Sequence, residues 1–409
     1  MENISKKDLQ IIRDLAKTQI EIAKSEKTQQ LKRDWLAHNT CKNGSRPMIH
    51  IELWTFMNDI IPSLMKCKGD SARNFEWRLH QNLVNHTIFG DDSVVKDYFP
   101  ISYNPSIKLF DLDVEVEQTG GLGHQFVHQI TDLKADFHKF EQKSTYHVNK
   151  PATLADIDNL NEVFGDILPA KIEGNSFYAV PTQKLVHFMG MENMLFAMYD
   201  YPDEFKAMMD KIADEYIGYF DWLKENDLIL PTVDGEYVAQ GSWAYTDELP
   251  SENVKTTNDV WGFLDSQETV NVSPDMFGEF IFPCYEKIAK HYGLLSYGCC
   301  EPVDAIFDKY LSKLSNMRKL SISPWCDEEK MGERLRGKNI VYHRKPSPNF
   351  LGVDVKLDED AVTEHIDKTL KAAKGCAIEF TQRDVYTVHN NPEKVRRFVE
   401  IIRERCENV

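Results

Sequence analysis

The chain has 409 residues, of which 42% are hydrophobic, so it can bury one large core or two ordinary ones. Its net charge of −17 argues against nucleic acid as a partner, because phosphate binding needs a basic face. A protein partner with a basic docking face is compatible with this charge. The N-terminus is charged and lacks a signal core, and no apolar run approaches the ~20 residues that span a bilayer. We therefore expect a cytoplasmic protein without a membrane partner.

The first half of the chain contains helices, strands and one aperiodic segment. Apolar spacing, with Pro and Gly as boundary signals, places these elements. The predicted elements are helices over 1–45, 77–86 and 202–225, strands over 46–53 and 228–233, and a long irregular connection over 120–150. Long irregular connections on compact enzymes are often functional.

From residue 294 onward, strand and helix alternate. The predicted strands are 294–297, 319–323, 339–343 and 376–380, and the helices that follow them are 303–314, 328–335, 359–373 and 392–405. Such alternation predicts a parallel sheet, and at this length the leading α/β form is a (β/α)8 TIM barrel. We predict a barrel over residues 96–409, with an N-terminal helical extension over residues 1–95 packed on it.

Polar side chains follow the predicted strands, at the rim where such barrels place catalysis. In chain order they are Asp234 and Glu236, then Cys299, Cys300 and Glu301, then Cys326 and Asp327, then His343 and Lys345, then Arg383 and Asp384. The eight cysteines of a chain without an export signal are expected to be free thiols or metal ligands.

Zinc prefers thiolate, imidazole and carboxylate ligands, and Glu236, Cys299 and Cys300 offer three of them. Neighbouring side chains leave a strand on opposite faces, so both thiols bind one ion only if the chain turns there. Otherwise Cys326 or His343 completes the ligand set. Simpler roles stay open as well: Glu236 can form a rim salt bridge, and His343 can be a hydrogen-bonded rim histidine.

Several sequence blocks also resemble a known family. They lie at 78–92 (from Arg78-Leu79-His80 to Gly90-Asp91-Asp92), at 190–203, at 266–283 (with Ser273-Pro274-Asp275-Met276-Phe277), at 296–301, at 321–325 and at 383–393. Together they resemble the uroporphyrinogen decarboxylase-like superfamily, in its branch of corrinoid (cobamide)-dependent methyltransferases, over nearly the whole chain. This resemblance implies a (β/α)8 barrel, in agreement with the alternation.

The chain departs from the family pattern at two places. The loop at 46–54 lacks the second and third arginines that grip tetrapyrrole carboxylates in the decarboxylase, so we do not expect that activity. The methyltransferase branch carries His-x-Cys and a later Cys, where this chain has Cys299-Cys300 and Asp384. A Glu/Cys/Cys set resembles methyl-donor enzymes whose metal activates the oxygen of methanol or a methyl ether.

The resemblance therefore implies a methyltransferase of the O-demethylase type. It would move a methyl group from a small methylated substrate, a methoxylated aromatic, to the cobalt of a separate corrinoid protein, with zinc activating the substrate oxygen. The expected catalytic residues are Tyr297, Glu301 and Asp384, and the expected substrate-binding residues are Tyr237, Trp243, Trp325, His343 and Arg383. The aromatic residues among them can also be ordinary rim packing, and Arg383 can simply pair with Asp384.

Two other functions remain open at this point. A metal-free decarboxylase or lyase on the same scaffold would bind no zinc and would depend on arginine and aspartate. An inactive corrinoid-binding homologue would bind the partner without turnover. The methyl donor, the direction of transfer and the oligomeric state, including a homodimer, are not fixed by the sequence.

Overall fold

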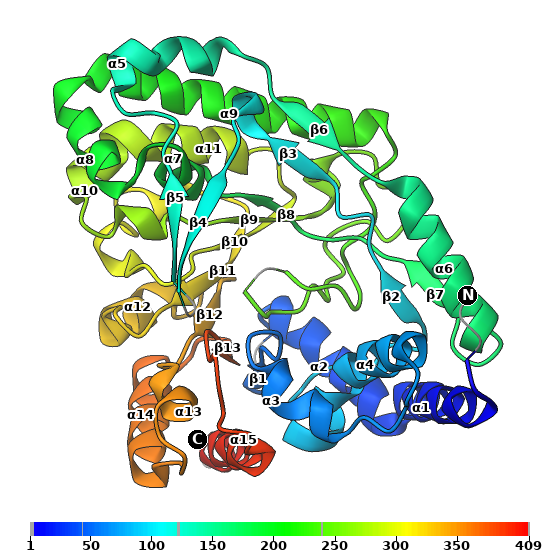
Figure 1. Ribbon diagram of the computed structural model, residues 1–409. Coiled ribbons are helices and arrows are strands. Elements are labelled where there is room, and N and C mark those ends of the chain that lie inside the picture. The colour runs from blue at the N-terminus through cyan, green and yellow to red at the C-terminus, as the bar shows by residue number, and fades with distance from the viewer. Residues whose placement is uncertain (1–3, 43, 121–122, 239, 408–409) are drawn as a thin grey trace.

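The computed structural model describes residues 4–42, 44–120, 123–238 and 240–407, and a parallel sheet of seven strands forms its centre (Figure 1). The strand order is β1-β13-β12-β11-β10-β9-β8. The bounds are β1 Met48–Ile51, β8 Phe177–Ala179, β9 Trp261–Leu264, β10 Leu294–Tyr297, β11 Met317–Ile322, β12 Val341–Arg344 and β13 Ile378–Gln382. Every neighbouring pair is parallel, so the carboxyl ends of all seven strands meet at one edge.

The first strand of the chain lies beside the last, as in a (β/α)8 barrel. A second parallel pair, β2 (Phe99–Ile101) and β7 (Ala170–Ile172), forms a separate sheet. The Asp92 amide donates to the Ile49 carbonyl at 2.8 Å, so the chain leading to β2 runs beside β1. No ladder joins β1 to β8 within the described residues. The structure thus has the strand order of a barrel, and closure of the sheet stays a prediction.

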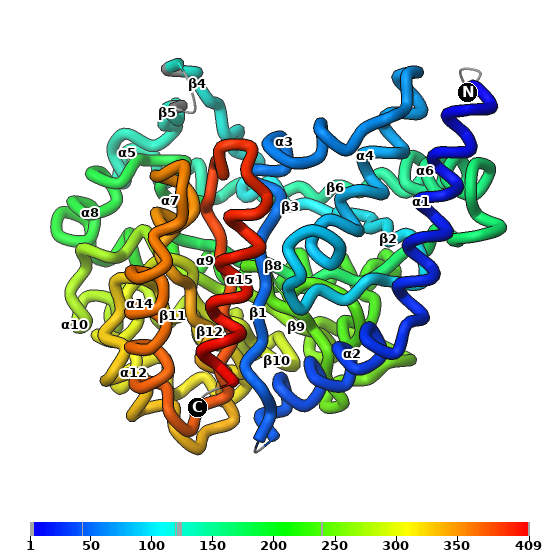
Figure 2. The backbone as a smooth tube through the Cα atoms, turned by 90° about the horizontal axis from the view of Figure 1, so that it is seen from below, coloured from blue at the N-terminus to red at the C-terminus, as the bar shows by residue number. Residues whose placement is uncertain are grey.

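Helices cover the sheet and flank its first strand. The long ones are α1 Lys6–Lys24, α2 Glu26–Asn39, α4 Asp70–Val84, α6 Lys150–Phe164, α7 Pro181–Met189, α8 Met191–Asp200, α9 Pro202–Glu225, α11 Phe282–Ala289, α12 Glu328–Leu335, α14 Glu359–Ala372 and α15 Pro392–Cys406. The short ones are α3 Met57–Ile60, α5 Leu133–Asp136, α10 Pro274–Met276 and α13 Asn349–Gly352. Figure 2 shows α15 running alongside β1. Within the described residues, no helix is long and apolar enough to cross a bilayer.

The N-terminal 95 residues contribute both helices and a strand to the fold, because β1 belongs to the main sheet. Arg403 on α15 contacts Asp92 at 3.2 Å, and Asp92 also accepts a bond from the Ile49 amide. The first and last parts of the chain are therefore joined by both a strand pair and an ion pair. The predicted domain boundary at residue 95 stays a prediction.

Most predicted elements match the structure, and two are wrong. The strand predicted over 228–233 is an extended segment without a ladder; Pro231 lacks an amide donor there, and the Trp261 amide donates to the Thr232 side chain instead. The helix predicted over 303–314 consists of short 3-10 turns at Val303–Ala305 and Leu311–Lys313. The apolar residues of this segment are buried, but burial at helical spacing is equally compatible with short 3-10 turns.

The segment predicted to be irregular over 120–150 contains more structure than expected. A hairpin of β4 (Glu115–Gly120) and β5 (Gly123–Val127) overlaps its start, and β6 (Thr145–His147) pairs with β3 (Ser106–Lys108) near its end. These short strands pack on the covering helices instead of joining the main sheet, which explains their weak periodicity.

The interior of the sheet carries charge where barrels usually carry branched apolar residues. Lys319 on β11 lies 2.9 Å from Glu379 on β13, and both side chains are fully buried. His343 on β12 and His38 on α2 approach the same carboxylate, at 3.6 and 3.5 Å. A buried ion pair is costly to break, because removing one partner leaves an uncompensated charge in a low-dielectric interior.

We expect Glu379→Gln to lower the free energy of unfolding by about 3–5 kcal/mol, because Lys319 would keep a buried charge without its partner. Guanidinium unfolding curves measure this loss. The matched control is Asp275→Asn, which removes the partner of the exposed Lys309 and should cost less than about 1 kcal/mol. The double variant Lys319→Met/Glu379→Leu should recover most of the stability; a double variant as unstable as Glu379→Gln would contradict this account.

Candidate functional site

Two adjacent thiols stand directly after β10. Gly298 has a φ of +95°, so the chain turns sharply as the strand ends. The turn removes the strand alternation that would point neighbouring side chains apart. The sulfurs of Cys299 and Cys300 consequently lie 3.6 Å from each other.

Groups from neighbouring strand ends surround the two thiols. The Arg383 guanidinium, after β13, lies 3.4 Å from the Cys299 sulfur, and Asp384 Oδ2 lies 3.6 Å from the Cys300 sulfur. Lys345, after β12, is buried and donates to the Cys299 carbonyl at 3.3 Å. The sequence thus brings Cys299, Cys300, Arg383 and Asp384 together as expected, because their strands are parallel.

The two thiols differ in their electrostatics. A hydrogen bond from the Cys299 thiol lowers the pKa of Cys300, and the lysine and arginine cations act in the same direction. The same hydrogen bond, together with burial, raises the pKa of Cys299. Cys300 is therefore the sulfur that holds a thiolate more readily.

Two of the predicted catalytic residues hold the loop after β10 in place. Glu301 accepts hydrogen bonds from the amides of Cys299 at 2.8 Å and Ser266 at 2.9 Å. The Tyr297 hydroxyl is 2.8 Å from the Ser266 hydroxyl, and burial raises the pKa of Tyr297. Neither side chain is among those that line the cavity described next.

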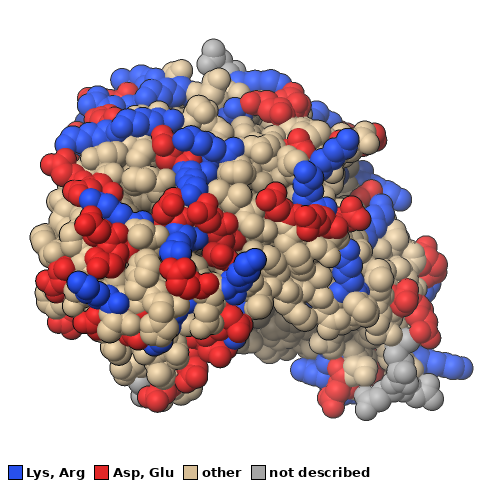
Figure 3. All heavy atoms as spheres, turned by 90° about the horizontal axis from the view of Figure 1, so that it is seen from above, with Lys and Arg blue, Asp and Glu red and all other residues tan. Residues whose placement is uncertain are grey.

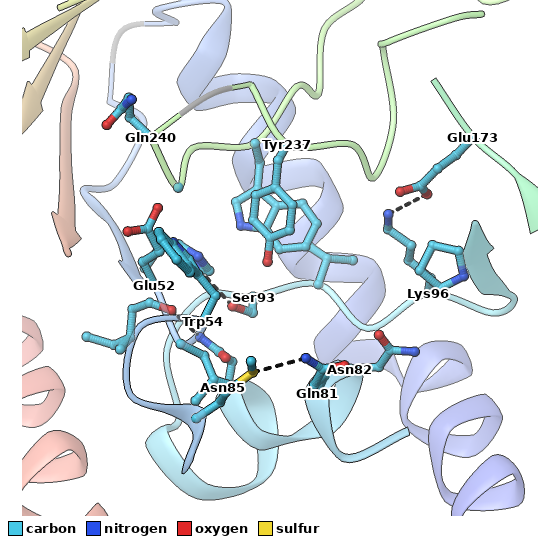
Figure 4. Close-up of a pocket in the computed structure, with 18 of the residues that line it drawn as sticks. Glu52, Trp54, Gln81, Asn82, Asn85, Ser93, Lys96, Glu173, Tyr237 and Gln240 are labelled. Atoms are coloured by element: carbon cyan, nitrogen blue, oxygen red, sulfur yellow. Dashed lines mark hydrogen bonds and ion pairs between the residues drawn. The ribbon is translucent and has the colours of Figure 1, made fainter. Parts of the chain in front are cut away.

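A cavity of about 350 Å³ lies beside the thiols, within the size range of small-molecule sites. Glu52 and Gln240 line the cavity and also contact the thiol region: Glu52 pairs with Arg383 at 3.3 Å, and Gln240 Oε1 lies 3.2 Å from the Cys299 sulfur. Figure 4 shows Glu52 on one side of the cavity and the Lys96–Glu173 ion pair on the other. These two residues therefore connect the cavity to the thiol pair.

Three large, partly exposed aromatic side chains line this cavity. Trp54 is 61% exposed, Tyr178 47% and Tyr237 48%, and all three line it. Burial nevertheless raises the pKa of Tyr237, because the ring lies in a recess of the protein. Exposed aromatic faces inside a concave site are suited to a flat apolar ring.

The remaining predicted substrate-binding residues divide into two groups. Trp243 lines the cavity and packs against Tyr237 with ring centroids 4.6 Å apart. Trp325 is 75% exposed and is not among the residues that line the cavity. His343 does not line the cavity either: it is buried and bonded to Thr381, and burial lowers its pKa to about 3.

Glu236 does not lie with the two cysteines as a third metal ligand. Its Oε2 accepts from the Asp234 amide at 2.9 Å, and burial raises its pKa to about 7, although the charge of Lys96 acts to lower it. Across the described ranges, no three His, Cys, Asp or Glu side chains are grouped so that they could hold a metal ion. The predicted Glu236/Cys299/Cys300 set therefore does not fit zinc in this structure.

The alternative ligands do not complete the set. Cys326 accepts from the Val303 amide at 3.3 Å, and burial raises its pKa. His343 faces Thr381 and Glu379 instead of the thiols. Only the spacing of the two thiols suits zinc: sulfurs bound tetrahedrally at about 2.3 Å stand roughly 3.8 Å apart, against 3.6 Å here.

The sequence interpretation missed several residues of this site. Glu52 follows β1, which ends at Ile51 although the predicted strand ran to residue 53. Asp265 follows β9, a strand that was not predicted from the sequence, so the rule that polar residues cluster after strands reached neither residue. Burial raises the pKa of Asp265, and the nearby Glu301 and Cys299 add to this. Gln240 lies in an irregular loop, where no periodic signal exists. His50 was read only as a strand residue.

Comparisons with known proteins agree with the fold. A methyltransferase from Methanosarcina mazei is similar over 91% of this chain and 98% of its own, with a TM-score of 0.51 and 15% sequence identity. A B12-independent methionine synthase from Shewanella sp. W3-18-1, in complex with selenomethionine, matches over 65% of this chain and 70% of its own, with a TM-score of 0.29 and 13% identity. No family model and no curated protein matches the sequence. At such identities, the first likeness supports the fold alone.

The unequal thiols generate a first prediction for this site. Limited iodoacetamide treatment at neutral pH should alkylate Cys300 before Cys299, because the thiolate is the nucleophile and Cys300 has the lower pKa. Tandem mass spectrometry locates the modified sulfur. Cys284, whose pKa is raised by burial, serves as the internal control that stays unmodified until unfolding. Earlier modification of Cys299 would contradict the direction of the hydrogen bond.

Metal analysis tests the ligand set. If the protein is purified without chelator, any bound zinc should persist in the variant Glu236→Gln. It should disappear in the double variant Cys299→Ser/Cys300→Ser, because only the distance between the two sulfurs suits binding to one ion. Metal content per chain is measured by mass spectrometry. Loss of zinc from Glu236→Gln would instead restore the ligand set predicted from the sequence.

Proposed function

We propose that this protein is a methyltransferase that removes a methyl group from a small methylated molecule bound in the cavity and delivers it to a corrinoid carried by a separate protein. The observation that carries the proposal is the joining of an aromatic-lined cavity to the thiol pair at the carboxyl ends of parallel strands. Active sites of barrel enzymes lie at this end of the strands.

The lining of the cavity supports an aromatic methyl ether as the donor. Trp54, Tyr178 and Tyr237 offer ring faces, while Lys96 with Glu173 and Glu52 with Arg383 bring polar groups to its sides. A flat ring with oxygen substituents combines an apolar face with hydrogen-bonding edges, so it complements such a lining. A purely aliphatic donor would leave the aromatic faces without a matching partner.

The chemistry of an ether requires help for the departing oxygen. An alkoxide or phenoxide is a poor leaving group, so its developing charge must be neutralised by a Lewis acid or a proton donor. Zinc activation was the expectation from the sequence, and no step is assigned to it because Glu236 does not join the thiols. Arg383 and Lys345 place positive charge next to the thiol pair and can stabilise a negative charge there.

The surface is compatible with a protein partner. On the face shown in Figure 3, acidic and basic side chains are interspersed. The net charge of −17 favours partners with a basic docking face over acidic ones. Corrinoid delivery by such a partner, in the cytoplasm, and formation of a homodimer remain parts of the proposal that solution experiments must test.

Methyl transfer is tested directly by incubating the protein with methoxyaromatics and a chemically reduced Co(I) corrinoid, and following methylation of the cobalt spectroscopically. We expect turnover with an aromatic ether, and a KM about tenfold higher for Tyr237→Ala, since one aromatic contact contributes about 1.5 kcal/mol. The matched control is Tyr199→Ala, which removes an exposed tyrosine of α8 outside the cavity and should change neither constant.

Two results would count against the proposal. Absence of methyl transfer from every ether, with cleavage of a carboxylated substrate instead, would favour the metal-free lyase. Tight corrinoid-protein binding without any turnover would favour the inactive homologue.

A further inference from the structure

A histidine at the end of the first strand is held by two groups of the adjoining loop. His50 Nδ1 on β1 lies 2.9 Å from the Ser93 hydroxyl and 3.4 Å from Asp91 Oδ2. The imidazole is also packed against Tyr237, with ring centroids 5.5 Å apart. These contacts fix the ring in one orientation.

The Asp91 carboxylate behind this histidine is itself fixed. Its Oδ2 accepts from the Ile51 amide at 2.8 Å and the Asn85 side chain at 2.7 Å, and its Oδ1 accepts from the Ser93 amide at 2.9 Å. Burial alone would raise the pKa of Asp91, but the bonds from His50, Asn85 and Ser93 lower it. Asp91 therefore keeps a negative charge beside the imidazole and helps to hold the ring in its orientation.

The other ring nitrogen is available to a ligand. Nδ1 is occupied by Ser93 and Asp91, whereas Nε2 has no hydrogen-bond partner among the residues that the structure describes. His50 lines the cavity together with Ser93 and the aromatic residues. A histidine oriented through one nitrogen, with the other free at a binding cavity, is the arrangement of a proton-transfer group.

We propose that His50 is the catalytic acid that protonates the oxygen leaving the methyl donor, with Asp91 as its positioning residue. This inference rests on the proposed function and goes beyond it, because neither the sequence resemblance nor the ligand analysis assigns His50 a role. It places the ether oxygen of the substrate at Nε2 and the aromatic ring against the exposed faces of Trp54 and Tyr237.

In the proposed step, the C–O bond of the ether breaks and its electron pair stays on oxygen. The Co(I) nucleophile of the corrinoid donates two electrons to form the new bond to the methyl carbon, and the cobalt is thereby oxidised to Co(III). The proton on Nε2 moves to the leaving oxygen, giving the free phenol and neutral His50. Water then returns a proton to Nε2.

The acids expected from the sequence are placed less well for this step. Tyr297 and Glu301 are engaged in bonds to Ser266 and the Cys299 amide. Asp384 faces the Cys300 sulfur, and it is not among the residues that line the cavity. His50 is thus the cavity residue with both a free nitrogen and a buried carboxylate behind it.

The experiment compares two aromatic methyl ethers that differ in the acidity of the phenol released, using a reduced corrinoid as acceptor. With the less acidic phenol, His50→Gln should lose about 10²–10⁴ in kcat, the usual contribution of a general acid. With a nitro-substituted phenol, whose oxygen can leave without a proton, the loss should shrink to less than about tenfold. Only a proton donor produces this dependence, since a packing defect would slow both ethers equally.

Controls separate folding from chemistry. His80→Gln, a matched variant on α4 outside the cavity lining, should keep wild-type rates with both ethers. If His50→Gln does not fold, as judged by circular dichroism, Ser93→Ala removes only the hydroxyl that orients Nδ1. That variant should show a smaller loss with the same dependence on phenol acidity.

Each outcome is informative. Equal slowing of both ethers, or no slowing of either, in folded His50→Gln would overturn the role of His50 and leave the proposed methyl transfer intact. Absence of transfer from both ethers by the wild-type protein would overturn the proposed function, and the role of His50 with it.

Discussion

Parallel pairing is the constraint on which this site depends. Seven strands run in one direction, so every loop that follows a strand emerges at the same edge, whatever its distance along the chain. For that reason Lys345 after β12 and Arg383 after β13 both contact Cys299, and Glu52 after β1 pairs with Arg383. The pairing of β1 with β13 matters most, because it brings a residue from the first eighth of the chain next to one from its end.

Charge is concentrated at two levels within the sheet. Lys319, Glu379, His38 and His343 form a buried group inside it, and the thiol site with its lysine and arginine lies at the strand ends. Buried charged groups keep their protein partners, because no water is available in the interior to replace those contacts. The inner group therefore links β11, β12 and β13 beneath the site through the Glu379 carboxylate.

The sequence predicted the parts of this architecture that have a local signal. The spacing of apolar residues predicts α9 and α12, and the rule that polar residues cluster after parallel strands predicts that Cys299, Cys300, Arg383 and Asp384 lie close together, as they do. The predicted zinc ligands are not grouped together: Glu236 was expected to follow a strand over 228–233, and that segment forms no ladder in the structure. The loop containing Glu236 and Gln240 has no ladder to fix it to the edge, and only Gln240 reaches the thiols. His50 could not be recognised from spacing, because its importance arises from Asp91 and Ser93, which the fold brings to it from beyond a helix.

The pairing of β1 with β13 has a consequence for synthesis of the protein. Ile49 pairs with Phe380, so the strand that leaves the ribosome first must wait for almost the entire chain before its neighbour exists. Contacts between residues so far apart in sequence slow folding, and an unpaired strand edge invites association with other chains meanwhile. Until β13 has been synthesised, the described partners of β1 that already exist include the segment around Asp92, whose amide bonds to Ile49, and α2, whose Trp35 packs with Met48.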